Sequence, residues 1–134
     1  MIKIKQELWN QIIEHLQKGW PNEACGILGG KNGVVTDIYP IPNIDENPKV
    51  RYLIDPKGQF LAIKDIRTKG TQMTAIFHSH PESPAYPSIT DVGLAFYPEA
   101  YYIIISLKDR KNPDAHAYKI NNGNIIEYPI IIEQ

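Results

Sequence analysis

Two histidines in the segment His78-Ser79-His80-Pro81 are the residues of this sequence best placed to do chemistry. On a β-strand, residues two apart project from the same face, so both imidazoles can reach one ion. On a helix, the same spacing would separate them by about 200°. The apolar run from Met73 to His78 predicts a buried strand leading into this segment, and Pro81 favours an end to regular structure there. The pair is a candidate metal site, although an isolated pair of this kind also occurs by chance on protein surfaces.

Asp91 follows His80 eleven positions later and offers a hard oxygen donor. With the two histidines it would complete three protein ligands and leave the fourth tetrahedral position to water, as in a catalytic zinc site. Asp91 also ends the sequence Ser88-Ile-Thr-Asp91, which has the pattern of a capping box with Ser88 as the N-cap. The two interpretations are compatible, because a helix beginning after Ser88 would place Asp91 in its first turn, beside the end of the strand.

Other polar residues are weaker candidates. Glu23 follows a Trp-Pro-Asn turn, where a glutamate is usually exposed, but it precedes a short apolar strand and could be held at the floor of a site. Glu82 could compete as a ligand, although a charge so close behind a proline is more typical of a solvated loop. Cys25 could be a soft ligand, yet a free cysteine more often acts as a small buried apolar residue. No chemistry is assigned to His15 or His116.

Periodicity predicts the elements that must position these residues. Apolar residues at three- and four-residue steps predict an amphipathic helix from Glu7 to Lys18, ended by Gly19 and Pro21. A second helix is expected over Lys57 to Thr68, with Asp55 as its N-cap and Gly70 after its end. Further strands are expected where apolar stretches lie between turn sequences: Cys25 to Leu28, Val34 to Tyr39, Tyr101 to Leu107, Ala115 to Ile120 and Ile125 to Ile131.

Turn chemistry separates these elements. Gly29-Gly30 followed by Lys31-Asn32-Gly33 predicts a hairpin turn between two strands. The proline-rich stretch from Pro40 to Pro56 predicts a loop, interrupted by the strand-like residues Val50 to Ile54. Strands mixed with two long helices and one shorter helix indicate a mixed α/β fold class. With no internal repeat and no composition boundary, residues 1–134 are expected to form one domain.

Composition excludes several classes of function. The 134 residues are 43% apolar and 22% charged, which is ordinary for a soluble globular protein. The chain has 14 basic and 15 acidic residues and no basic run, which argues against nucleic acid or an anionic membrane as a partner. It shows neither a signal peptide nor an apolar run long enough for a membrane helix, so a cytoplasmic location is expected. A single cysteine fits a reducing compartment.

The candidate residues together resemble the JAMM signature of the JAB1/MPN (JAB1/Mov34) metallopeptidases: Glu23, His78-x-His80-Pro81, Ser88 and Asp91. The likeness to the small prokaryotic branch covers nearly the whole chain, including Pro21 to Gly30, the Ile41-Pro42-Asn43 loop, Arg51-Tyr52 and Ile54-Asp55-Pro56. The resemblance implies zinc held by His78, His80 and Asp91, Glu23 as general base, and Ser88 as a donor to the oxyanion. It also implies the JAB1/MPN fold, which is related to the cytidine deaminases and has a curved, mostly antiparallel sheet packed between helices.

The resemblance also suggests a substrate. Family members that trim ubiquitin chains carry insertions for which this chain is too short, so selectivity for polyubiquitin is not expected. Small prokaryotic relatives act on ubiquitin-like sulfur-carrier proteins that end in Gly-Gly, and some release cysteine from the carrier in cysteine biosynthesis. Hydrolysis of a peptide or isopeptide bond after such a Gly-Gly is the leading hypothesis. The leaving group, one cysteine or a longer tail, and a homodimeric state are left open.

Other classes of function make different demands on the sequence. A catalytically silent MPN scaffold that only binds a protein partner would be expected to lack ligands, whereas every signature residue is present here. A deaminase on the related fold would show H-x-E with a later P-C-x-x-C, and this chain has one cysteine. A peptidase with an unrelated substrate, acting in cell-wall or phage-tail assembly, is a further alternative, and cell-wall action would more naturally come with a secretion signal or a second domain.

Overall fold

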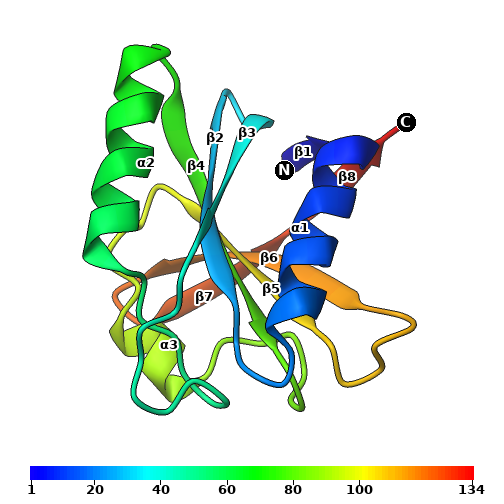
Figure 1. The fold of residues 1–134 in the computed structure, drawn as a ribbon. Helices are drawn as coiled ribbons and strands as arrows, with labels where there is room; N and C mark the ends of the chain where they lie inside the picture. Colours follow the sequence, from blue (N-terminus) through cyan, green and yellow to red (C-terminus); the bar gives the residue numbers. More distant parts are fainter.

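A single mixed sheet organises the computed structural model, which describes all residues from 1 to 134 (Figure 1). The strands run in the order β7-β6-β5-β4-β2-β3-β1-β8, and four of the seven pairings are antiparallel. In chain order the elements are β1 (Ile2–Lys5), α1 (Gln6–Gly19), β2 (Cys25–Lys31), β3 (Val34–Ile41), α2 (Pro56–Thr68), β4 (Gln72–His80), α3 (Ile89–Gly93), β5 (Tyr101–Ser106), β6 (Asp114–Asn121), β7 (Asn124–Tyr128) and β8 (Ile130–Glu133). None of the three helices has the length and apolarity needed to cross a membrane.

The two ends of this sheet are joined through one residue, Pro129. β7 and β8 lie at opposite ends of the strand order, yet only Pro129 separates them in the chain. The sheet must therefore curve strongly, so that one edge comes round to the other. The prediction of a single strand from Ile125 to Ile131 was wrong, because β7 pairs with β6 whereas β8 pairs with β1. Proline lacks the N–H that a continuous ladder would need at this point.

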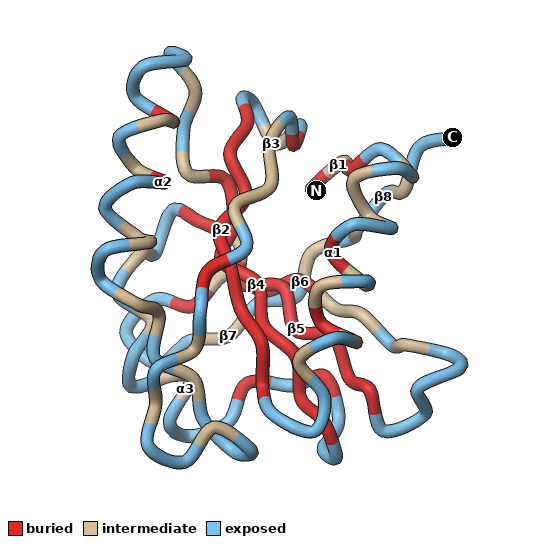
Figure 2. The backbone as a smooth tube through the Cα atoms, viewed as in Figure 1, coloured by how far each residue is buried: buried red, intermediate tan, exposed pale blue.

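The helices cover both faces of the sheet and bury a separate apolar cluster on each (Figure 2). Ile12 and Leu16 of α1 pack in one cluster, and Ala62 and Ile66 of α2 pack in the other. Successive residues of β4 alternate between the two, with Phe77 on the α1 side and Ile76 on the α2 side. By this alternation His78 and His80 lie on the same face as Ile76, the face that α2 covers.

Both long helices agree with their predictions. α1 extends one residue beyond the predicted helix at each end, and α2 starts at Pro56 with Asp55 as N-cap, accepting the backbone N–H of Lys57 at 3.4 Å. Gly70 follows α2 with a positive φ of 69°, a conformation that glycine adopts without strain. The periodic apolar face was therefore enough to locate these two elements.

Two local predictions need correction. Gly29 and Gly30 are buried within β2 beside a bulge, and the turn is made by Asn32 and Gly33, both with positive φ. A Cβ on Gly30 would lie 2.1 Å from the Val34 carbonyl oxygen, so the close approach of the strands explains this glycine. Residues 50 to 54 do not form a strand and contribute one isolated bridge, from Ile54 to Asn43.

β1 was not predicted. Its four residues alternate between buried Ile2 and Ile4 and the more exposed Lys3 and Lys5. The strand pairs in parallel with β8 from the other end of the chain, so its existence depends on a contact that no local window contains.

Candidate metal centre

Two histidine side chains converge at the carboxyl end of β4. As predicted, His78 and His80 lie on a strand and share a face, and their Nε2 atoms are 3.1 Å apart. β4 is flanked by β2 and β5 within the sheet, and both imidazoles are almost completely buried. The ring of Tyr52 stacks on His78 with 4.3 Å between centroids and closes the site on that side.

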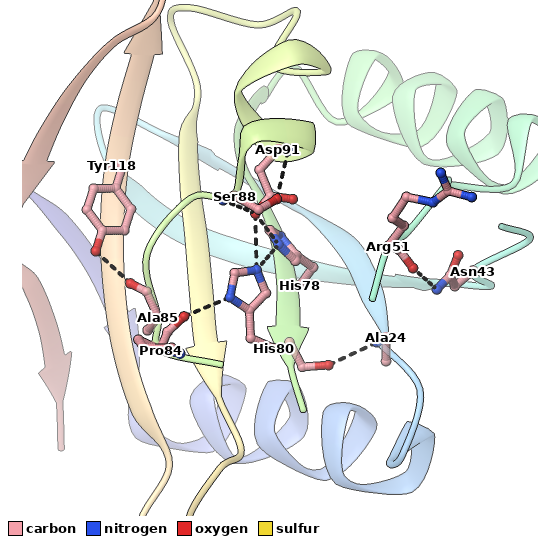
Figure 3. A network of polar contacts seen from close by, with 11 residues as sticks. Ala24, Asn43, Arg51, His78, His80, Pro84, Ala85, Ser88, Asp91 and Tyr118 are labelled. Atoms are coloured by element: carbon pink, nitrogen blue, oxygen red, sulfur yellow. Dashed lines mark hydrogen bonds and ion pairs between the residues drawn. The ribbon is translucent and has the colours of Figure 1, made fainter. Parts of the chain in front are cut away.

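Asp91 joins the histidines from the first turn of α3. Its Oδ2 atom is 3.0 Å from His80 Nε2 and 3.3 Å from His78 Nε2 (Figure 3). The predicted capping box is present: Asp91 N–H donates to Ser88 Oγ at 3.0 Å, and Ser88 N–H donates to Asp91 Oδ2 at 2.9 Å. The cap therefore directs the Asp91 carboxylate toward the histidines, so the capping box is confirmed, and metal ligation by Asp91 stays a prediction that is compatible with it.

The separations of these three atoms suit a tetrahedral metal ion. Ligand atoms about 2.0–2.1 Å from a zinc ion stand about 3.3 Å from one another along the edges of the tetrahedron. His80 Nδ1 is 2.8 Å from the Pro84 carbonyl oxygen, which can only accept, so Nδ1 carries the proton and Nε2 presents its lone pair. Nitrogen and carboxylate atoms that converge in this way can hold a cation between them.

The pKa values of His80, His78 and Asp91 depend on their burial and on their contacts with one another. Burial acts to lower the pKa of His80, but bonds to Asp91 and the Pro84 carbonyl outweigh it and hold the pKa above its ordinary value. Burial lowers the pKa of His78. Burial would raise the pKa of Asp91, but the contacts of its carboxylate with His78 and His80, which favour positive charge on the rings, and the bond from Ser88 N–H hold this pKa far below its usual range. The aspartate is thus a permanent anion that attracts positive charge, a proton or a metal ion, to the histidine nitrogens.

Glu23 provides a second carboxylate beside the histidines. The side chain is 4% exposed, and a carboxylate oxygen and the two histidine nitrogens lie within 4.8 Å of one another. Burial raises the pKa of Glu23 to about 8, opposed by the nearby His80 and reinforced by Asp91. Its backbone is fixed on both sides, because its N–H donates to the Pro48 carbonyl at 2.7 Å and its carbonyl accepts from Asn43 Nδ2 at 2.9 Å.

Two buried polar side-chain atoms of the protein have no hydrogen-bond partner, and both belong to this centre. They are Oε1 of Glu23 and Nδ1 of His78. Buried polar groups are normally paired, so an unpaired carboxylate oxygen next to potential ligands marks a place where a further group binds. Glu23, His80 and Ser88 also line one cavity of about 340 Å³ that opens to solvent. A substrate can therefore reach the centre.

Comparisons with known proteins show which sequences this chain is similar to. Residues 5–121 match the family described as prokaryotic homologues of the JAB domain. The chain is 32% identical to the CysO-cysteine peptidase of Mycobacterium tuberculosis over 137 residues, covering 100% of this chain and 93% of that protein. It is 34% identical to the desampylase of Haloferax volcanii over 103 residues, covering 72% of this chain and 74% of that protein.

The chain belongs to the prokaryotic JAB family. Its structure resembles the solution structure of a protein from Desulfitobacterium hafniense, with a TM-score of 0.90 and 38% identity over 100% of this chain and 94% of that one. A JAB1/MPN domain protein from Archaeoglobus fulgidus shares the fold, with a TM-score of 0.64 and 21% identity over 97% of each chain. The predicted JAB1/MPN fold is therefore confirmed.

Other candidate residues of this JAB-family chain stand apart from the centre. Cys25 is fully buried, donates weakly to the Ile41 carbonyl at 3.4 Å, and has its pKa raised by burial to about 12. It is a core residue, as its usual behaviour suggested. Glu82 is exposed at the edge of the cavity, His15 contacts the Cys25 carbonyl, and His116 pairs with Glu127 and Asp114.

Sequence reasoning about this JAB-family chain missed several residues that hold the site. Tyr52 and Asn43 were noticed only as parts of the resemblance, although Tyr52 stacks on His78 and Asn43 binds the Glu23 carbonyl. The Pro84 carbonyl, which orients His80, gave no sequence signal because every residue carries a carbonyl.

Proposed function

We propose that this protein is a zinc-dependent peptidase that hydrolyses the bond after the C-terminal Gly-Gly of a ubiquitin-like sulfur-carrier protein. One observation carries the proposal: His78, His80 and Asp91 converge at tetrahedral spacing, beside the unpaired carboxylate oxygen of Glu23. The substrate class is supported by the CysO-cysteine peptidase and desampylase relatives and by a 32% identical relative, a probable TtuB-protein conjugate cleaving protease of Thermus thermophilus.

The residues around the centre divide the chemical work. His78, His80 and Asp91 would hold the zinc ion, which when bound would polarise the scissile carbonyl and acidify an attacking water. Glu23 accepts a proton from that water and passes it to the leaving amine. Ser88 Oγ accepts the Asp91 N–H, which leaves the hydroxyl proton free to donate to the oxyanion that develops on the carbonyl.

A Gly-Gly tail suits the burial of the base. Because Glu23 is only 4% exposed, the scissile bond must enter a recessed site. Glycine has no Cβ, so two successive glycines give the narrowest chain that can approach such a floor. A second, mostly apolar hollow beside the centre is lined in part by Tyr52, Leu53 and Phe96, and offers apolar contact to a polypeptide substrate.

The proposed activity is tested by incubating the protein with several sulfur-carrier proteins extended after Gly-Gly by cysteine or by a longer tail. Mass spectrometry is expected to show loss of the extension, complete inhibition by a zinc chelator, and recovery when zinc is restored. A carrier ending in Ala-Ala before the same extension serves as the control and should be cleaved much more slowly. Cleavage that persists in the chelator, or no cleavage of any carrier, would rule out the proposed activity.

The position of Lys49 supports a single residue as the leaving group. Lys49 is the only lysine or arginine lining the cavity that Glu23, His80 and Ser88 share, so it can attract the free α-carboxylate of a single departing residue. We expect Lys49→Gln to lower kcat/KM for a Gly-Gly-Cys carrier by about two- to fivefold, the value of an exposed ion pair of about 0.5–1 kcal/mol. For the same carrier ending in cysteine amide, Lys49→Gln should leave kcat/KM unchanged. Lys111→Gln, which replaces an exposed lysine outside this cavity, should leave kcat/KM unchanged for both carriers. An equal effect on both carriers would argue against carboxylate recognition.

A further inference from the structure

The segment from Pro81 to Pro87 connects the two parts of the metal centre. It follows the histidines of β4 and precedes Ser88 and Asp91 of the α3 cap. Prolines at 81, 84 and 87 remove three backbone donors. The only backbone hydrogen bond inside the segment runs from Tyr86 N–H to the Pro84 carbonyl. Side chains must therefore hold a segment on which the relative position of the ligands depends.

Three consecutive carbonyls of this segment each accept a side-chain hydrogen bond. Ser106 Oγ donates to Ser83 at 2.7 Å, His80 Nδ1 donates to Pro84 at 2.8 Å, and Tyr118 Oη donates to Ala85 at 2.6 Å. Figure 3 shows the bonds of His80 and Tyr118 side by side. Ser106 lies at the end of β5 and Tyr118 lies on β6, and both side chains are buried. Two strands of the sheet therefore hold the Ser83 and Ala85 carbonyls, on either side of the Pro84 carbonyl that orients His80.

We propose that Ser106 and Tyr118 are positioning residues for the metal centre. We call their two hydroxyl bonds to Ser83 and Ala85 the carbonyl clamp. The clamp holds the Pro84 carbonyl where it accepts His80 Nδ1–H, and so keeps the His80 Nε2 lone pair directed at His78 and Asp91. Partners that orient a ligating histidine typically change metal affinity 10- to 100-fold. This inference rests on the proposed function, because it assumes that the centre binds zinc.

A purely structural role makes a different prediction. Any buried hydroxyl stabilises the fold through its hydrogen bond, so removing one lowers the free energy of unfolding wherever it lies. Tyr102 is a matched control: it is the cross-strand partner of Tyr118, it is equally buried, and its hydroxyl accepts from Tyr97 N–H instead of holding the segment. If Tyr118 is a positioning residue, Tyr118→Phe weakens zinc binding and Tyr102→Phe does not. If both hydroxyls only stabilise the fold, the two variants have the same zinc affinity.

The decisive measurement is the zinc Kd, obtained by competition with a chromophoric chelator. We expect Tyr118→Phe and Ser106→Ala each to raise the Kd by about tenfold, and the double variant by up to about 100-fold. Tyr102→Phe should stay within about twofold of the unmodified protein, even where its thermal stability falls as much as that of Tyr118→Phe. A double variant within about twofold, or a Tyr102→Phe variant as weak as Tyr118→Phe, would overturn the proposal.

A second measurement needs no metal. Long-range ¹H–¹⁵N correlation spectra of the metal-free protein should show His80 protonated on Nδ1, with a mixture of tautomers in the Ser106→Ala/Tyr118→Phe double variant. An unchanged Nδ1–H signal in the double variant would show that the clamp does not orient His80. This readout also separates the two hypotheses, because a protein that bound no zinc would refute the proposed function while the histidine spectrum would still report on the clamp.

Discussion

Replacing Glu23 with glutamine is expected to lower kcat by about 10²–10⁴-fold, the usual contribution of a positioned general base, while zinc binding is retained. Glutamine has the shape of glutamate but cannot accept the proton of an attacking water. The fold should tolerate the change, because Glu23 is fixed through its backbone N–H and carbonyl, and its Oε1 has no partner to lose. The carboxylate also carries a desolvation cost, seen in its raised pKa, that the neutral amide avoids.

This variant also decides between two possible ligand sets. Glu23, His78 and His80 are close enough to hold an ion without Asp91, so a Glu23→Gln protein that loses zinc would make Glu23 a ligand and not the base. Steady-state kinetics on a cleavable carrier and zinc content by mass spectrometry should be measured on the same preparation. Glu82→Gln is the matched control, because Glu82 lines the same cavity but is exposed, and it should keep nearly full activity. Wild-type turnover in Glu23→Gln would refute the base assignment.

Residues of the centre could be predicted where a short stretch of sequence carries the pattern that indicates them. The histidine pair needs only the two-residue period of a strand, and Asp91 needs only a capping box, so both were found from short windows. Glu23 lies 55 positions before His78 in the chain, and its sequence surroundings pointed weakly to exposure. It reaches the site because Cys25 pairs with His78 across β2 and β4, and only the family resemblance anticipated that contact.

The same division applies to the fold. α1 and α2 repeat their apolar pattern over several turns, so their limits were predicted to within one residue. β1 and β8 are four residues each and exist by pairing with each other from opposite ends of the chain. The carbonyl clamp could not be predicted from the sequence either. Its acceptors are backbone oxygens, which every residue carries, and Ser106 and Tyr118 lie in segments that predict only strands. Contacts of this kind become evident only when the strands are placed side by side.

Removing a ligand should have the largest effect of all. We expect Asp91→Asn to weaken zinc binding by more than about 100-fold, because even partners outside the ligand set cost 10- to 100-fold, and to abolish peptidase activity. Asparagine keeps an oxygen that can accept the Ser88 N–H, so the capping box survives and the loss can be assigned to the missing charge. His78→Ala should lose the metal as well, since it removes one of the two nitrogens that Asp91 Oδ2 approaches.

Thermal unfolding with and without zinc gives a test that does not depend on substrate. A ligand that binds only the folded state stabilises it by about 2.7 kcal/mol at 100 times its Kd, so zinc should raise the Tm of the unmodified protein but not that of Asp91→Asn. Asp114→Asn is the control, because Asp114 also pairs with a histidine, His116, at 3.1 Å but lies on the exposed surface. That variant should keep the full shift. If Asp91→Asn kept the shift while Glu23→Gln lost it, the third ligand would be Glu23, and the base would have to be sought elsewhere in the cavity.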